Sequence, residues 1–150
     1  MKKFVIAVSS ILLLGVVVFS FTDKSPVREI ILTKKAPMPI GPYSQAIKVG
    51  NTLYVAGQVG FTLDGKLDST SIETEVTQAL NNIKAIVEAA GMTMQQVVKS
   101  TLYVKDLKNF SKINEIYATY FPKDPPARET IGVAALPKGA HFEISVVVVK

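Results

Sequence analysis

The sequence has 150 residues and a mass of 16.2 kDa, enough for one ordinary domain with a sizeable core. It contains no cysteine, which excludes thiol nucleophiles, cysteine-bound zinc, iron–sulfur clusters and lipidated-cysteine anchors. Its single histidine, His141, leaves little scope for a histidine metal site or a Ser–His triad. Any chemistry must use carboxylates, arginine, tyrosine, hydroxyls and backbone groups.

The positive charge is spread along the chain. The net charge of +5 comes from 17 Lys and Arg against 12 Asp and Glu, and all the basic residues but Arg28 and Arg128 are lysines. No basic run is longer than two residues. Because proteins that bind nucleic acid usually carry a basic stripe with interleaved aromatic residues, we expect a solvated surface and no nucleic-acid partner.

The N-terminus is a separate segment. Two lysines precede an uncharged apolar stretch at residues 4–21, a pattern typical of a secretory signal or a membrane anchor. As a helix with a rise of ~1.5 Å per residue, the stretch reaches ~27 Å, just short of a hydrocarbon core. We interpret residues 1–21 as a signal peptide or a retained anchor, and expect an exported, periplasmic protein whose only membrane contact is this leader. Residues 22–27 read as a linker, and residues 28–150 as one domain.

Strand patterns dominate the first part of that domain. Residues 28–33, 46–49 and 52–56 are predicted strands, with a Pro- and Gly-rich loop after the first. Gly50-Asn51 between the last two is a two-residue signal for a β-hairpin. These three strands therefore precede any helix.

The apolar period then changes to that of helices. Residues recurring every three or four positions predict a helix over 72–90. Thr70 and Glu73 fit a capping box at its start, and Gly91 suits a left-handed residue at its end. A second helix stops before Pro122, and its apolar stripe consists of Phe110, Ile113, Tyr117 and Tyr120.

Three further strands complete the pattern, at residues 98–105, 128–135 and 142–149. The order β-β-β-α-β-α-β-β predicts an α+β domain with one mixed sheet and both helices on one face. In the first of these strands the expected inward residues are Val98, Ser100, Leu102 and Val104. The last strand is apolar on both faces apart from Glu143 and Ser145, so the open face needs a cover and we expect self-association.

Two charged residues stand out as candidates for chemistry. Arg128 enters a strand with small neighbours, which leaves space for an anion that a guanidinium binds through two parallel hydrogen bonds. Glu143 lies in an apolar strand, where loss of solvation raises a carboxyl pKa toward the range of a general acid or base. The alternative for each is a structural ion pair, Arg128 with Glu129 or Glu143.

Other candidates carry weaker signals. Tyr43 lies in a rigid Pro- and Gly-rich loop that can hold a phenol in place, or it is a simple lid over the core. Asn114 lies in the second helix, and Gly57 follows a strand where backbone N–H groups can face a ligand. His141 has no obvious partner in the sequence.

Several motifs together resemble the RidA/YjgF family of reactive intermediate deaminases. The resemblance covers residues 29–150 and leaves the leader out. Its motifs follow in order: Ile-Gly-Pro-Tyr-Ser-Gln-Ala (40–46), Ala-Gly-Gln-Val (56–59), Asn-Ile-Lys-Ala-Ile-Val-Glu-Ala-Ala-Gly (82–91), Thr-Leu-Tyr-Val-Lys-Asp-Leu (101–107), Pro-Ala-Arg (126–128), Ala-Leu-Pro (135–137) and Phe-Glu-Ile (142–144).

The resemblance implies a chorismate-mutase-like fold and a homotrimer with substrate clefts between subunits. It also implies cofactor-free hydrolysis of the imine and enamine acids 2-aminoacrylate/2-iminopropanoate and 2-iminobutanoate to 2-oxo acids and ammonia. Arg128 would then hold the substrate carboxylate and Glu143 would activate the attacking water. The remaining cleft residues would be Tyr43, Gly57, Asn114 and Thr130.

Three features depart from the family pattern. Glu129 follows the arginine where a small residue is usual, although strand alternation predicts that it points away from Arg128. Gly60 replaces a frequent proline and is expected to loosen a cleft loop. The export signal is the largest departure, and it keeps open a non-catalytic alternative, a trimeric protein that binds small carboxylates or acts as a holdase.

Overall fold

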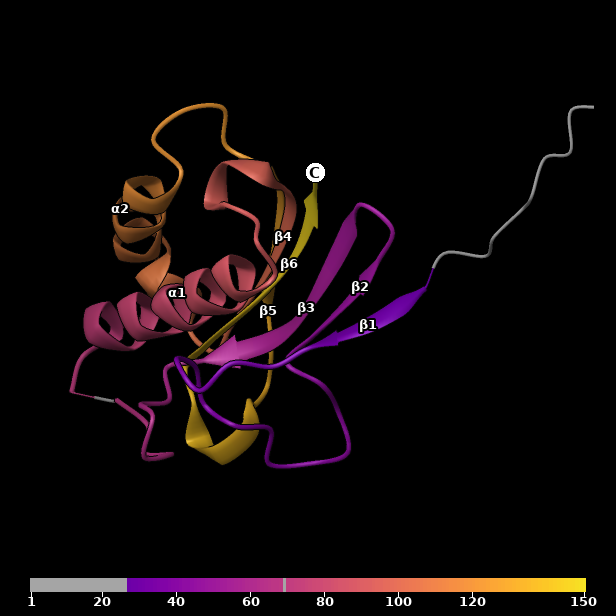
Figure 1. Cartoon of the computed structure of the whole chain (residues 1–150). Helices are drawn as coiled ribbons and strands as arrows, with labels where there is room; N and C mark the ends of the chain where they lie inside the picture. Colours follow the sequence, from indigo (N-terminus) through magenta and orange to yellow (C-terminus); the bar gives the residue numbers. More distant parts are fainter. Residues whose placement is uncertain (1–26, 69) are drawn as a thin grey trace, which may run out of the picture.

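The computed structural model of the chain (Figure 1) describes residues 27–68 and 70–150, so the predicted leader and all but the last residue of the linker lie outside the described residues. The elements follow the predicted order, joined by short 3₁₀ helices η1 (Met94–Gln96), η2 (Leu107–Asn109) and η3 (Pro137–Gly139). The main elements are β1 (Arg28–Ile31), β2 (Ala46–Val49), β3 (Thr52–Val59), α1 (Ile72–Ala89), β4 (Val97–Val104), α2 (Phe110–Tyr120), β5 (Ala127–Gly132) and β6 (Phe142–Val149).

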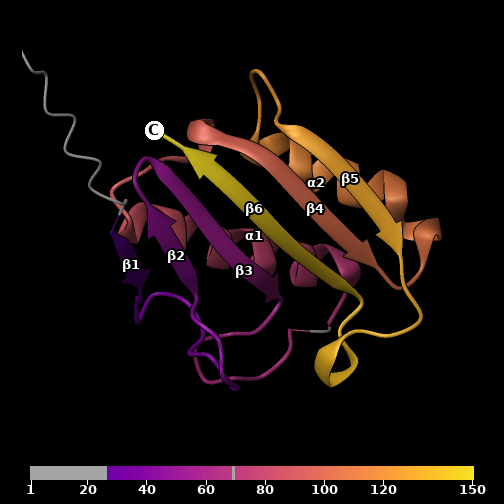
Figure 2. The ribbon, with the colours of Figure 1, turned by 90° about the vertical axis from the view of Figure 1, so that its right-hand side faces the viewer.

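The strands form one mixed sheet in the order β1-β2-β3-β6-β4-β5. Only the β4–β5 pair is parallel among the described strands, because α2 carries the chain back between them. Both helices lie on one face of the sheet, behind it in Figure 2. The predicted α+β fold with one mixed sheet is therefore confirmed.

The predicted hairpin turn lies where the sequence placed it, whereas the N-terminal cap of the first helix lies one residue further along the chain. Val49 pairs with Thr52 across the predicted hairpin turn, where Gly50 has φ 57°. Helix α1 is capped one residue later than predicted: the Ser71 hydroxyl accepts from the Thr74 N–H, and the Thr74 hydroxyl accepts from the Ser71 N–H. The expected Thr70–Glu73 box is wrong, since Ser71 offers the same hydroxyl at the position that precedes the helix.

The core lies between α1 and the central strands. The side chains of α1 that face the sheet are buried against alternate residues of β6, from Phe142 to Val148. A register shift between Val97 and Lys99 changes the start of β4, so that Val97 points inward. The predicted inward position of Val98 is therefore wrong, and its side chain is 46% exposed.

Several strand ends also differ from the sequence pattern. Strand β1 ends at Ile31 and not at residue 33, since its last partner on β2 is Ala46. Strand β3 continues to Val59, beyond the predicted end at residue 56, because β6 offers it a partner through a second register shift between Val55 and Gln58. Strand β5 ends at Gly132 and not at residue 135, since its last partner on β4 is Val104.

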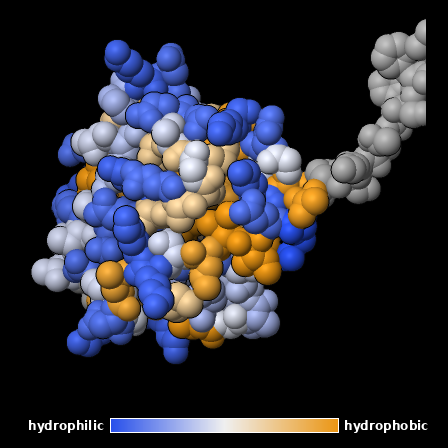
Figure 3. All heavy atoms as spheres, viewed as in Figure 1, coloured by the Kyte–Doolittle hydropathy of each residue, from blue (hydrophilic) through white to orange (hydrophobic). Residues whose placement is uncertain are grey.

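The other face of the sheet carries no helix. Its register places an apolar row across four strands, Ile30, Ile47, Tyr54 and Val147. Figure 3 shows apolar atoms gathered toward the side of the molecule where β1 to β3 lie. None of the helices in residues 27–68 and 70–150 is both long and apolar enough to span a membrane.

Candidate functional site

The six residues singled out from the sequence fall into two groups of three. Tyr43, Gly57 and Glu143 line one pocket of about 330 Å³ at the end of β3. The others, Arg128, Asn114 and Thr130, lie at α2 and the edge strand β5. The first group joins residues from distant parts of the sequence, and the second joins α2 to the strand that follows it.

Glu143 is the one charged residue among the described residues that line its pocket. No Lys, Arg or His in the described part of the chain forms an ion pair with it, so the alternative of a structural ion pair is not realised there. Burial raises the pKa of the Glu143 carboxyl because the charged form loses hydration. A carboxylate in this state suits a general base.

The backbone of Gly57 makes room for that carboxyl group. Gly57 lies in the register shift of β3, opposite the start of β6. A Cβ atom at this position would overlap Oε1 of Glu143 and lie 2.8 Å from its Cδ. The absence of a side chain therefore lets Glu143 lie flat against the strand.

Tyr43 is held by its own loop. Its hydroxyl accepts a hydrogen bond from the Ile40 N–H at 3.3 Å, and its ring packs over Gly41. The loop is tied down by Gln45, a buried residue whose amide bonds the backbone of Thr33, Ala36 and Pro37. Sequence reasoning missed Gln45, although its place inside the Tyr-Ser-Gln-Ala motif was the available signal.

Arg128 points to the helix side of the sheet. Its guanidinium carbon lies 4.8 Å from the centroid of the Tyr117 ring and 5.7 Å from that of Phe110. The Tyr117 hydroxyl shares a hydrogen bond of 2.7 Å with Ser100, and burial raises the pKa of Tyr117. The two aromatic rings thus pack against the guanidinium group, and the hydrogen bond to Ser100 fixes the Tyr117 ring.

Two buried polar atoms in the same group have no hydrogen-bond partner among the described residues, Asn114 Oδ1 and Thr130 Oγ1. Asn114 lies four residues after Phe110 and three before Tyr117, on the helix face that Arg128 touches. Thr130 lies two residues after Arg128 on the same face of β5. A buried polar atom without a partner is costly, so these atoms mark a place that a ligand or another chain completes.

Glu129 does not neutralise Arg128. Its carboxylate lies 3.0 Å from Nζ of Lys99 and accepts from the Thr101 hydroxyl, on the face of the sheet opposite Arg128. The alternation expected from the sequence is thus what the structure has. The alternative ion pair of Arg128 with Glu129 or Glu143 is absent from the described residues.

The two groups are separated by the sheet. Arg128 pairs with the inward residue Ser100, whereas Glu143 pairs with Tyr103 on the face without helices. In addition, β4 lies between β5 and β6. One subunit therefore does not bring Arg128 and Glu143 to the same small molecule.

A buried carboxylate next to the Glu143 strand escaped the sequence analysis. Glu75 on α1 is 1% exposed, and its Oε1 accepts from the backbone N–H groups of His141 at 2.6 Å and Phe142 at 3.0 Å. Its Oε2 lies 3.0 Å from Nδ1 of His141, so this histidine has a partner after all.

Gly60 packs against Glu75, since a Cβ at Gly60 would lie 2.7 Å from the Glu75 carbonyl oxygen. Gly60 thus allows close packing, and does not act as the loosening element that the sequence suggested.

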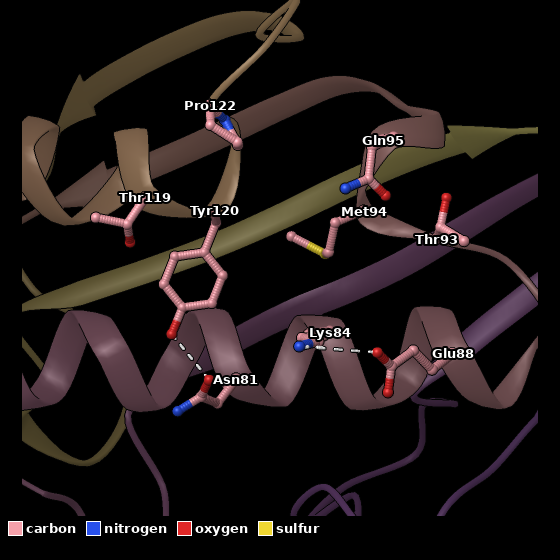
Figure 4. Close-up of a pocket in the computed structure, with 9 residues that line it drawn as sticks. All are labelled: Asn81, Lys84, Glu88, Thr93, Met94, Gln95, Thr119, Tyr120 and Pro122. Atoms are coloured by element: carbon pink, nitrogen blue, oxygen red, sulfur yellow. Dashed lines mark hydrogen bonds and ion pairs between the residues drawn. The ribbon is translucent and has the colours of Figure 1, made fainter.

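A second groove of about 560 Å³ lies between α1 and the end of α2, away from all six candidates. In Figure 4 the Tyr120 hydroxyl points to Asn81, with which it bonds at 2.8 Å, and Lys84 faces Glu88. Within the described ranges, no three His, Asp or Glu side chains gather as a metal site.

The mixed sheet with two helices on one face makes this an α+β protein, and solved structures of RidA and YjgF proteins share the fold. The family model described as endoribonuclease L-PSP matches residues 33–150, and the chain belongs to this family, which confirms the resemblance to RidA/YjgF proteins.

The matches to similar proteins cover nearly the full length of those proteins. A RutC family protein of Pyrococcus horikoshii is 47% identical over 124 residues, covering 82% of this chain and 98% of that protein. The human 2-iminobutanoate/2-iminopropanoate deaminase is 45% identical over 127 residues, covering 84% and 93%. Among solved structures, RidA from Psychrobacter sp. PAMC 21119 has 41% identity and a TM-score of 0.79, covering 81% and 99%. TdcF of E. coli with bound serine has 34% identity and a TM-score of 0.78, covering 81% and 98%.

Proposed function

We propose that the protein hydrolyses small 2-imino acids and their enamine tautomers, 2-aminoacrylate/2-iminopropanoate and 2-iminobutanoate, to 2-oxo acids and ammonia. The observation that carries the proposal is Glu143, a half-buried carboxylate with a raised pKa and no ion-pair partner in the described residues. Relatives that are named 2-iminobutanoate/2-iminopropanoate deaminase support the same reaction.

The chemistry requires little beyond positioning. Glu143 accepts a proton from water as the water oxygen attacks the imine carbon, which gives a tetrahedral carbinolamine. The carboxyl group then returns the proton to the nitrogen and, as a carboxylate, accepts the hydroxyl proton while the C–N bond breaks. Ammonia leaves, the C=O group of the 2-oxo acid forms, and Glu143 releases to solvent the proton that the protonated imine brought. Gly57 keeps the carboxyl in place, and the phenol of Tyr43 lines the same pocket.

Arg128 binds the substrate carboxylate in this proposal, with Asn114 and Thr130 as further partners. Because Arg128 and Glu143 of one chain lie on opposite faces of the sheet, the complete site combines Glu143 of one subunit with Arg128 of its neighbour. We expect a homotrimer that covers the row from Ile30 to Val147 and brings the edge strand β5 of one subunit, which carries Arg128, against the Glu143 pocket of the next.

The first experiment adds the protein to threonine dehydratase with threonine and follows the release of 2-oxobutanoate. We expect acceleration by the wild type and none by Glu143→Ala or Arg128→Ala. Equal amounts of the two variants, unfolded and refolded together, should regain roughly a quarter of wild-type activity, because random mixing restores that share of two-chain sites. No recovery from a mixture that forms trimers would refute the shared site.

A non-catalytic role in binding small carboxylates is the second candidate. The Thr130 hydroxyl, which has no partner among the described residues and lies on the same strand face as Arg128, favours it, since a hydroxyl can donate a hydrogen bond to a carboxylate without a base. Calorimetric binding of 2-oxobutanoate by folded wild-type protein, with no acceleration of imine hydrolysis, would select this role. The scattered basic charge disfavours RNA binding, and a filter-binding assay at low salt tests this expectation.

Export is a separate proposal. The basic end and apolar stretch at residues 1–21 support a periplasmic location, with either cleavage of the leader or retention of an anchor. Cell fractionation combined with N-terminal sequencing of the mature protein tests both parts. Recovery of the intact chain in the cytoplasmic fraction would refute export.

A further inference from the structure

The pocket around Glu143 is larger and more apolar than the smallest imines require. Its volume of about 330 Å³ falls among pockets that hold drug-sized ligands, roughly 300–1,000 Å³. The side chain of 2-iminopropanoate is a single methyl group. The lining of the pocket includes Met38, Ile40, Val59 and Phe61, which offer no charge to a substrate.

The pocket also continues beyond these residues. A neighbouring groove of about 630 Å³ shares Met38, Ile40 and Phe61 with the pocket and extends to Leu63 and Leu67. Two charged side chains line the groove, Lys138 and Asp64, and the exposed Asp64 carboxylate is paired with Lys66 at 2.8 Å. The route from Glu143 toward Leu63 is therefore predominantly apolar.

Three of these apolar side chains are largely exposed to solvent, a position where polar residues are more common. Met38 is 52% exposed, Ile40 63% and Leu63 64%. All three belong to loops that flank one end of the sheet, not to the apolar row across the sheet face. Exposed apolar groups that converge on a carboxylate pocket are typical of a binding surface for an apolar ligand.

The apolar part of the pocket and groove, lined by Met38, Ile40, Phe61, Leu63 and Leu67, is called the annex below. We infer that the annex binds the side chain of the substrate, and that the protein prefers 2-imino acids with bulky apolar side chains, such as those derived from leucine and phenylalanine. This inference rests on the proposed function. The imine carbon lies against Glu143 and the carboxylate points toward the neighbouring subunit's Arg128. The side chain then extends along Met38 and Ile40 toward Leu63.

The test compares imines of alanine, leucine and phenylalanine. An L-amino-acid oxidase forms each imine from the amino acid and O₂, catalase removes the hydrogen peroxide, and spontaneous hydrolysis is subtracted. We expect kcat/KM to be at least ~10-fold higher for the leucine and phenylalanine imines than for the alanine imine, the size of effect that apolar pockets give.

Variants locate the effect. Met38→Ser and Ile40→Ser should lower kcat/KM about 10-fold for the bulky imines and less than about twofold for the alanine imine. Leu63→Ser should act mainly on the phenylalanine imine, which reaches furthest. Leu32→Ser is the matched control, an exposed apolar residue that lines neither pocket nor groove and should leave all three rates unchanged.

The outcomes separate this inference from the proposed function. Hydrolysis of all three imines with no preference for the bulky ones, or with equal losses in the variants, overturns the annex and leaves the deaminase standing. No hydrolysis of any imine removes both. Sedimentation of each variant completes the test: if Met38→Ser or Ile40→Ser dissociates the assembly, a neighbouring subunit covers the annex, and the inference is wrong.

Discussion

Replacement of Gly57 by alanine tests the link between fold and chemistry most directly. The added Cβ would overlap Oε1 of Glu143 and lie 2.8 Å from its Cδ. Gly57 has no positive φ, so its backbone accepts alanine without strain. The atoms in the way belong to the end of a flexible side chain, and we expect the Glu143 carboxyl to swing out of its place while the strand stays intact.

The expected effect on stability is small. Forcing Glu143 into a poorer rotamer costs about 1 kcal/mol, and replacing a glycine restricts the unfolded chain by about 0.4–1 kcal/mol in the opposite direction. The free energy of unfolding should therefore change by less than about 1 kcal/mol, which corresponds to a shift in Tm of at most about 4 °C. A misplaced general base, in contrast, should lower kcat/KM by about 10²–10⁴.

The assay pairs urea unfolding with imine hydrolysis. In Gly57→Ala/Glu143→Ala the overlap is absent, so this double variant should be no less active than Glu143→Ala and slightly more stable. Gly60→Ala is the contrasting control, because its Cβ meets the backbone of Glu75 and should cost about 1–3 kcal/mol of stability. If Gly57→Ala keeps turnover within twofold of the wild type, the placement of Glu143 against Gly57 has no role in catalysis.

Three further predictions concern single groups. Because burial raises the pKa of Glu143, kcat/KM should fall on acidification at a higher pH than an ordinary glutamate gives. Protonation also stabilises the folded state, so Glu143→Gln should raise the free energy of unfolding at neutral pH and lose this gain below the ordinary carboxyl pKa. Tyr117→Phe leaves the Ser100 hydroxyl without a partner and should cost about 1–3 kcal/mol in urea unfolding, most of it recovered in Tyr117→Phe/Ser100→Ala. Glu75→Ala removes the acceptor for two backbone N–H groups and should cost about 3 kcal/mol by the same measurement, whereas Glu75→Gln keeps an acceptor oxygen and should cost less; equal losses would refute a hydrogen-bonding role.

The fold was predictable because its signals are local. Gly50-Asn51 and the three- to four-residue period of α1 each act within a few positions, and both mark elements that the structure has. Register shifts depend on the partner strand. The alternation of apolar residues in the sequence therefore did not show that the side chain of Val97, and not that of Val98, points into the core.

The candidate site was predictable only by residue type and resemblance. Glu143 and Arg128 stood out as charges among apolar or small neighbours, but nothing in a sequence says that they face opposite sides of the sheet. Glu75 falls within the buried stripe of α1, and a carboxylate there requires a partner. Its partner, His141, is 66 residues away, beyond the reach of any periodic pattern.

The position of β6 in the sheet has a consequence for synthesis. This strand lies between β3 and β4 but follows both in the chain. While the polypeptide leaves the ribosome, β3 and β4 therefore wait with an unpaired edge each, and the helices have no central strand to pack on. We therefore expect the sheet to close only after β6 has emerged, and a nascent chain that stalls before residue 142 to expose two unpaired strand edges that are open to aggregation.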